Sequence, residues 1–263
     1  MIVLSLIFIP APAPCDEQLS DMITDRPTRA ANTAIVQPGY VLWETGFKFS
    51  RYDVDDDQSD EIDFLDSVFR IGLVEKAELR AGWLSGKWRD GSSIDSTEDS
   101  TGIGDASLGL KFRFNEEKGT IPTIALLLAM VVPIGDEEFS SERFYPSAIV
   151  AFSHTLPSSL GLVYNLGVLA TSGQDSTGEI ETHTYFDYSA ALSYGGNPLF
   201  APFLEAFGTA PISGSGSSSF SLGGGITSLV LSNLQLDASG GVNITDSATG
   251  WFVGVGFSVR FPR

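Results

Sequence analysis

The sequence predicts an all-β fold: a single-chain antiparallel transmembrane β-barrel of about twelve strands, with short periplasmic turns and long acidic extracellular loops. Apolar residues recur at every second position from residue 40 onward, as in strands with one apolar face. The connections between these segments alternate between short and long. In addition, 43% of the 263 residues are hydrophobic although the net charge is −18. A soluble acidic chain is normally less apolar.

The first four predicted strands show the alternation most clearly. In the first, Trp43 and Phe47 alternate with Glu44 and Lys48. Such a charged face needs water or partners, so it should point away from the lipid. The four strands span 40–52, 64–73, 77–88 and 104–114.

The later predicted strands are more varied. The segments 121–134 and 145–156 are apolar on both faces, and 199–208 is apolar apart from Glu205. We expect Glu205 to face inward because a lone carboxylate facing lipid is costly. The remaining predicted strands span 160–171, 183–194, 219–230, 234–243 and 250–261.

The connection lengths assign the two rims of the barrel. Short turns at one rim and long loops at the other are the periplasmic and extracellular ends of an outer-membrane barrel, so both termini should lie in the periplasm. The predicted short turns are near 74–76, 115–119, 157–159, 195–198 and 231–233. The predicted long loops are 53–63, 89–103, 135–144, 172–182, 209–218 and 244–249.

A two-sheet soluble sandwich is the alternative fold, and alternation alone does not say which face points outward. The polar face carries acids and bases interleaved with glycine, which suits a narrow wet lumen. The apolar face carries aromatic residues near strand ends, as at the two bilayer interfaces. Closure into a barrel also pairs every strand edge, which matters most in lipid. We therefore place the chain in the outer membrane of a diderm bacterium.

The residues before the barrel divide into two segments. Residues 1–14 are an apolar stretch followed by Pro and Ala, and we interpret them as a signal-peptide remnant. Residues 15–38 are then an N-terminal periplasmic segment or a plug that folds into the barrel, and 39–263 form the barrel itself. Lipidation of Cys15 stays an open alternative, although Pro14 departs from the small-residue pattern of a lipobox.

Several classes of function are disfavoured. The chain has no basic patch for nucleic acid, and its single cysteine and two histidines form no zinc spacing, so we expect no metal and no cofactor. No Gly-x-Ser-x-Gly motif accompanies His154 or His183, which disfavours a lipid hydrolase. We expect a protein that performs no chemistry.

Charged residues on the polar strand faces are the candidates for the lumen. They either select the solute or form cross-strand ion pairs that hold the wall together. The candidates are Glu44, Arg70, Glu78, Arg80, Asp105, Lys111 and Asp237. In the first long loop, Asp55, Asp56 and Asp57 are candidates for binding or steering cations, against the simpler interpretation of a solvated loop.

Short motifs occur in a fixed order along the chain. They are Ile23-Thr24-Asp25-Arg26-Pro27, Val36-Gln37-Pro38-Gly39-Tyr40, Glu44-Thr45-Gly46, Arg70-Ile71-Gly72-Leu73, Glu78-Leu79-Arg80, Gly102-Ile103-Gly104-Asp105, Gly109-Leu110-Lys111, Pro133-Ile134-Gly135, Tyr164-Asn165-Leu166-Gly167 and Leu234-Gln235-Leu236-Asp237. Together they resemble the phenol meta-pathway degradation (MetA-pathway) family of transporter-like outer-membrane β-barrel proteins. The resemblance runs from about residue 23 to 261 and implies an outer-membrane channel or uptake protein.

We therefore expect a channel for small solutes, aromatic or hydrophobic ones among them, that contacts outer-membrane lipid. The alternating C-terminal strand that ends at Phe261 resembles the signal read by the outer-membrane assembly machinery, a further expected partner. The alternative is a structural or adhesive barrel with a plugged lumen, and a lipid hydrolase is the third reading.

Overall fold

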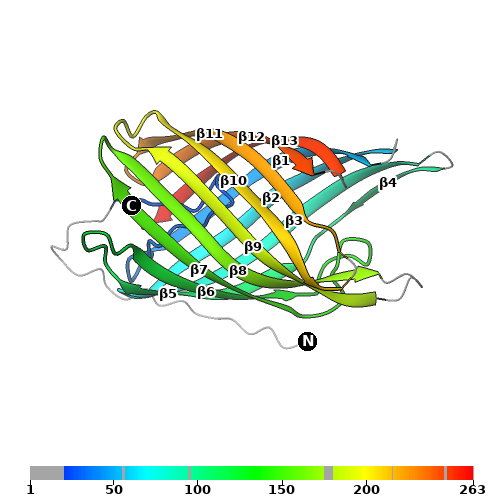
Figure 1. The fold of residues 1–263 in the computed structure, drawn as a ribbon, viewed down its shortest axis with the longest axis horizontal. Helices are drawn as coiled ribbons and strands as arrows, with labels where there is room; N and C mark the ends of the chain where they lie inside the picture. The colour runs from blue at the N-terminus through cyan, green and yellow to red at the C-terminus, as the bar shows by residue number, and fades with distance from the viewer. Residues whose placement is uncertain are drawn as a thin grey trace.

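The computed structural model describes residues 21–54, 57–93, 96–174, 180–214, 216–245 and 248–262. The predicted signal remnant, Cys15, Asp55 and Asp56 lie outside these residues. Within them the chain forms one antiparallel sheet, which the pairing of β2 with β3 closes into a barrel (Figure 1). The strands are β1 (Val41–Val54), β2 (Asp57–Val74), β3 (Ala77–Ser93), β4 (Ser96–Gly102), β5 (Ala106–Asn115), β6 (Thr123–Val132), β7 (Tyr145–Leu156), β8 (Leu160–Gln174), β9 (Ile180–Tyr194), β10 (Ala201–Ser213), β11 (Ser219–Leu231), β12 (Leu234–Thr245) and β13 (Ala248–Phe261).

Strands β4 and β5 together make one crossing of the barrel, because both pair with β3. Residues Ala77 to Trp83 of β3 pair with β5, and residues Lys87 to Ser93 pair with β4. Residues 103–105, which are not in a strand, connect β4 to β5. The described strands therefore make twelve crossings, which confirms the predicted fold class and strand number.

Five of the six predicted long loops were too long, because strands also extend into 172–182, 209–218 and 244–249. The largest differences are in the first two. The segments 53–63 and 89–103 were expected to be loops, but β1, β2, β3 and β4 extend through most of them. Their sequences are polar on both faces and so lack the alternation that identified the other strands. A membrane-spanning β-strand needs only about 9–11 residues, whereas β2 has 18 residues and β3 has 17. These extensions thus continue the barrel wall beyond the apolar band.

The alternation sets which side chains face the interior. Outward-facing apolar side chains are exposed, with 55% exposure at Leu108, 70% at Leu204 and 56% at Val255. Inward-facing Arg70 and Lys111 are fully buried. A wall that is apolar outside and charged inside is the arrangement of a barrel in lipid. Among the described residues, no helix is long and apolar enough to cross a membrane.

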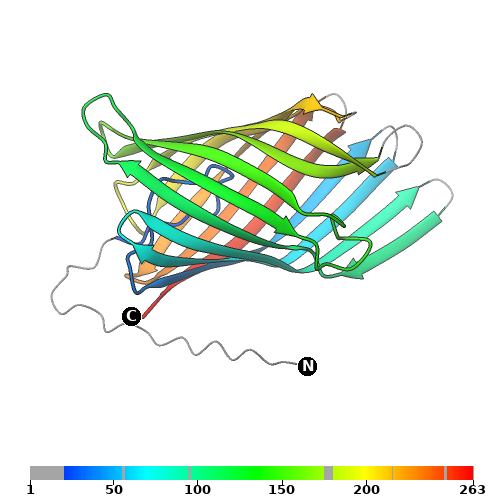
Figure 2. The same ribbon diagram turned by 90° about the horizontal axis from the view of Figure 1, so that it is seen from below.

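The chain before β1 lies inside the barrel. Figures 1 and 2 show this stretch in blue, within the end that also holds the C-terminus. A turn at residues 37–40 leads it into β1, with Gly39 at a φ of 84° and a hydrogen bond from the Tyr40 N–H to the Gln37 carbonyl of 3.0 Å. Met22, Val36 and Leu42 form a small buried apolar cluster, against which Tyr40 packs. We call residues 21–38 the inner segment.

Candidate functional site

Charged side chains of neighbouring strands meet on one side of the interior. Arg70 of β2 bonds Glu44 of β1 at 2.9 Å and Glu78 of β3 at 2.8 Å. Arg80 lies 3.0 Å from the Glu78 carboxylate, and Lys111 of β5 lies 3.7 Å from the same carboxylate. The register explains the contact, since Glu78 lies directly opposite Lys111 and Arg70 opposite Arg80.

Asp25 of the inner segment completes this group. Its carboxylate lies 2.6 Å from Arg80, 3.1 Å from Lys111 and 3.6 Å from Arg70. Burial alone would raise the pKa of the Asp25 carboxyl, but the positive charges of Arg70, Lys111 and Arg80 hold it well below its usual range. We call these residues the ionic cluster, which contains three acids and three bases: Asp25, Glu44, Glu78, Arg70, Arg80 and Lys111.

The wall charges of the cluster also bind the backbone of the inner segment. The Arg26 N–H donates to Glu44 at 2.9 Å, and the Val36 N–H donates to Glu78 at 2.8 Å. In the other direction Arg70 donates to the Ala34 carbonyl at 2.8 Å. Buried backbone groups that have no secondary structure need such partners. The strand charges therefore hold a segment that has no regular structure of its own.

Strands on the other side of the barrel bind the tip of the inner segment. The Arg29 N–H donates to Glu205 of β10 at 2.8 Å, and the Arg29 side chain bonds Asp187 of β9 at 3.0 Å. Asn165 of β8 exchanges two hydrogen bonds with the backbone of Ala31, of 2.7 and 2.9 Å. Inward-facing Glu205 agrees with the orientation expected from its sequence.

Two further contacts complete the ring around the inner segment. Asp237 of β12 bonds Arg26 at 3.1 Å. On β7, the Ser153 hydroxyl accepts a hydrogen bond of 2.9 Å from Thr33. The segment thus reaches most of the circumference of the wall.

The inner segment is also bonded to itself. The Asn32 N–H donates to the Asp25 carboxylate at 2.9 Å, and the Thr28 hydroxyl donates to the Ala30 carbonyl at 2.8 Å. Residues 25–32 therefore form a closed loop that crosses the interior. We call this part the inner loop.

Six of the seven lumen candidates meet the inner segment or the ionic cluster, whereas Asp105 does not. Asp105 precedes β5 and accepts hydrogen bonds from Gly135 at 2.9 Å, from the Ser140 hydroxyl at 2.9 Å and from the Ser141 N–H at 2.6 Å. Burial alone would raise the pKa of the Asp105 carboxyl, but the bonds from Ser141, Gly135 and Ser140 lower it below its ordinary value. Asp105 thus anchors the loop between β6 and β7.

Aromatic side chains form an apolar part of the interior wall. The rings of Phe207 on β10 and Phe252 on β13 lie 6.3 Å apart, although two strands separate them in the sheet. Glycine makes this possible, because a Cβ at Gly241 would lie 2.6 Å from the Phe252 ring. Phe203 covers Gly225 in the same way, at 2.8 Å. We call Phe203, Phe207 and Phe252 the aromatic wall.

Sequence reasoning missed Asp25, the two arginines of the inner segment and the aromatic wall. The inner segment carries charges of both signs beside Pro27, a weak signal that 15–38 folds inward. For the aromatic wall, the signal was the glycine-rich stretch 219–230 next to a strand that is apolar on both faces. Glycine on one strand leaves room for a ring from the next.

Nearer the end of the barrel opposite the C-terminus, the interior wall is ionic on β1, β2 and β3. Lys48 bonds Asp63 at 2.8 Å, Lys87 bonds Glu61 at 2.8 Å, and Arg89 bonds Glu61 at 3.2 Å. These acids and bases pair across adjacent strands, as opposite charges do on one face of a sheet. A solute inside the barrel would therefore meet an ionic wall on one side and aromatic rings on another.

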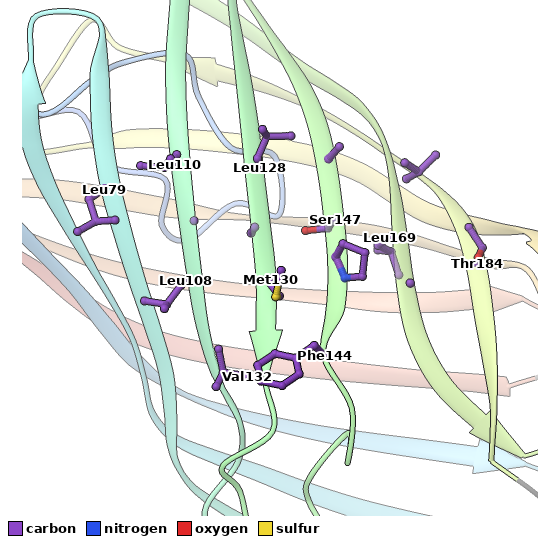
Figure 3. Close-up of a pocket in the computed structure, with 16 residues that line it drawn as sticks. Leu79, Leu108, Leu110, Leu128, Met130, Val132, Phe144, Ser147, Leu169 and Thr184 are labelled. Atoms are coloured by element: carbon purple, nitrogen blue, oxygen red, sulfur yellow. The ribbon is translucent and has the colours of Figure 1, made fainter.

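An apolar groove of about 850 Å³ lies on the outer face of the barrel. Figure 3 shows its lining residues on adjacent strands, among them Leu108, Leu128 and Met130. These side chains alternate with inward-facing ones such as Lys111, so they face the lipid. The groove belongs to the membrane surface of the barrel and is separate from the interior.

Metal binding has no support within the described ranges. No group of three His, Cys, Asp or Glu residues among them is arranged to hold a metal ion. His154 lies 3.8 Å from Glu117 at a short turn, and His183 lies 3.7 Å from Glu181 near the extracellular rim. The two histidines are thus at opposite ends of the barrel.

Comparison with known proteins gives a family and a fold. A family profile described as "Putative MetA-pathway of phenol degradation" matches residues 24–261. Among curated proteins, none matches the sequence.

Solved structures of outer-membrane barrels match the fold. The COG4313 outer membrane channel from Pseudomonas putida F1 is 12% identical with a TM-score of 0.68, and the match covers 89% of this chain and 100% of that one. The β domain of the Bordetella autotransporter Brka is 13% identical with a TM-score of 0.58, over 84% and 99% of the two chains. The NanC porin is 8% identical with a TM-score of 0.54, over 82% and 98%. At these identities the likeness concerns the fold.

Proposed function

The chain belongs to the family described as "Putative MetA-pathway of phenol degradation", and on this premise we propose that it is an outer-membrane channel for small aromatic or otherwise apolar solutes. The barrel fold is that of outer-membrane proteins, one of which carries the name of a channel. The family description supplies the aromatic class of solute. The chain performs no chemistry in this proposal.

The aromatic wall is the observation that carries the proposal. Phe207 and Phe252 face the interior and are partly exposed there, whereas Phe203 is buried. Aromatic pairs offer stacked and edge-on contacts to a further ring. A channel selective for ions relies instead on rings of charged side chains or backbone carbonyls.

The ionic cluster has a supporting role in this proposal. Its acids and bases balance one another and are bonded to the inner segment, so they offer no free charge to a solute. We propose that they position the inner segment and that the aromatic wall selects the solute. The outer-membrane assembly machinery stays a proposed partner, through the last strand β13, which ends at Phe261.

Uptake by whole cells tests the proposal. In cells that lack their general porins, expression of the chain should accelerate the initial uptake of radiolabelled toluene over the empty-vector rate. Phe207→Ala with Phe252→Ala should lower that uptake by about three- to tenfold, the equivalent of one lost aromatic contact. The matched control is Phe220→Ala, which removes an outward-facing ring of β11. Equal uptake by the double variant and the parent would contradict a role for the aromatic wall.

A structural barrel with a filled interior is the second candidate. It is favoured by the bonds that the inner segment makes with strands around the wall, from β1 to β12. The same experiment separates the two functions. Cells that express correctly folded chain and take up toluene no faster than the vector control would favour the structural barrel.

A further inference from the structure

The inner loop is held unequally by the two sides of the barrel. On β1, β2, β3 and β5 its partners are the charges of the ionic cluster, and Arg70, Glu78 and Lys111 there are fully buried. On β8, β9 and β10 its partners are an amide and two carboxylates, and Thr33, the next residue after Asn32, bonds a hydroxyl of β7. We infer that the inner loop is a hinged gate, which stays fixed to the ionic cluster and opens along β7–β10. This inference rests on the proposed function, because it names the path that the solute takes.

The fixed side is costly to separate. Glu78 bonds Arg70 and Arg80 and also receives the Val36 N–H, and Asp25 pairs with Arg70, Arg80 and Lys111. Withdrawing the segment would leave buried charges without partners, which is strongly destabilising. The ionic cluster therefore keeps its hold while the rest of the loop moves.

The opening side is easier to separate. The Arg29 side chain is 52% exposed, so its bond with Asp187 is screened by water. Asn165 and Ser153 are neutral, and their hydrogen bonds exchange for water at small net cost. Glu205 receives an N–H from the loop and would be hydrated in its place. Asn165, Asp187 and Glu205 are themselves buried, but each bonds the loop at one residue, whereas Asp25 pairs with three bases on the fixed side.

The opening side leads to the aromatic wall. Asn165 lies directly opposite Ser189, and Ser189 lies directly opposite Phe207, so the three side chains form one row across β8, β9 and β10. Displacing Ala31 from Asn165 would clear the interior beside Phe207. An apolar solute would thus pass between the inner loop and this half of the wall.

A reversible disulfide tests the gate. The hydroxyl oxygens of Thr33 and Ser153 lie 2.9 Å apart, so cysteine sulfurs at these positions need little movement to reach the bonded distance of about 2.0 Å. In a Cys15→Ser background, Thr33→Cys with Ser153→Cys should lower the conductance in planar bilayers at least several-fold when oxidised. Reduction of the same sample should restore it. Each single cysteine variant should be insensitive to oxidation.

A loosening variant tests the same gate from the other direction. Asn165→Ala removes both bonds with Ala31 and should raise the conductance. Ser189→Ala is the matched control on the next strand, where the hydroxyl has no hydrogen-bond partner among the described groups, and it should leave the conductance unchanged. Adding the oxidised disulfide to Asn165→Ala should return the conductance to the closed level, which a simple widening of the interior would not do.

The outcomes separate the gate from the proposed function. Equal conductance of the oxidised and reduced disulfide variant, with both folded by heat-modifiable migration, would overturn the gate. Conductance of the disulfide variant that follows its redox state, together with no toluene uptake by the reduced variant, would support the gate and reject the apolar solute. Uptake and conductance that both fall on oxidation and recover on reduction support both.

Discussion

Asp25 lies outside the strands, yet it balances the charges of the side chains within them. Without Asp25 the ionic cluster would hold three bases and two acids. The same carboxylate receives the Asn32 N–H and so closes the inner loop. One residue therefore links the shape of the loop to its position in the barrel.

The depressed pKa of Asp25 predicts an acid-resistant inner segment. Its carboxyl has a folded pKa below the unfolded value of about 3.9, so its contribution to docking is complete above that value and is lost as the pH falls through the folded pKa. We expect the conductance in planar bilayers to be unchanged between about pH 7 and pH 5. Asp25→Asn should raise the conductance throughout this range, whereas the exposed Asp21→Asn should not. A rise in the parent near pH 6 would contradict this assignment.

Residue-level prediction succeeded where the strand pattern constrained the side chain. Glu44, Arg70, Glu78 and Lys111 were identified as inward-facing because they alternate with apolar neighbours. Asp25 was not identified, because an irregular segment has no period from which a direction follows. Whether the predicted strand residues select the solute or hold the wall together stays a prediction.

The break between β4 and β5 changes how the wall is built on that side. Above the break, the loop between β6 and β7 takes the place of a paired strand, with Asp136 bonded to both backbone groups of Ile103. Asp105 anchors the far part of the same loop through Ser140 and Ser141. Two carboxylates thus replace the ladder of a regular strand pair.

Removing the Asp105 anchor should expose this loop to protease. Asp105→Ala deletes the hydrogen bonds from Gly135, Ser140 and Ser141, and bonds to a charged acceptor contribute about 1.5–3 kcal/mol each. Because cleavage follows the population of the opened loop, trypsin should cut after the exposed Arg143 at least about tenfold faster. Fragment appearance on a gel measures the rate.

The control for that experiment is Glu137→Ala, which removes an exposed carboxylate from the same loop. It should leave the cleavage rate within about twofold of the parent, as surface substitutions do. Similar cleavage of Asp105→Ala and the parent would show that Asp136 alone holds the loop.

At the scale of elements, prediction was good where strands contact lipid and poor beyond it. The bounds of β7 and β12 were predicted to within two residues. The extensions of β2 and β3 carry no apolar stripe, so composition alone assigned them to loops. Pairing with each other, and not lipid contact, makes them strands.

The whole molecule is a closed sheet with its interior filled by its own N-terminal chain at one end. Closure pairs the strand edges, which would otherwise have no partner in lipid. The number of crossings followed from sequence, because it depends on alternation, whereas the assignment of the two rims to the periplasm and the cell surface stays a prediction. Closure at β2–β3, and the course of the inner segment, depend on contacts between distant residues that no single sequence reveals.

Closure also predicts resistance to detergent. The purified protein should stay folded in sodium dodecyl sulfate at room temperature and migrate differently after boiling, because unfolding must break the whole ladder in one step. Gel migration before and after boiling measures this. Identical migration of the two samples would contradict the barrel.

The uneven strand lengths give the barrel a tall side and a low side. Strand β2 has 18 residues and β6 has 10, a difference of roughly 26 Å along the strand at about 3.3 Å per residue, or about 18 Å along the membrane normal at a tilt of about 45°. The β1–β2 and β3–β4 hairpins then stand above the bilayer, whereas the rim at β6 and β7 lies near the lipid headgroups. At the cell surface, antibodies and phages would reach the tall side first, and the low side would be shaded by the surrounding glycolipid.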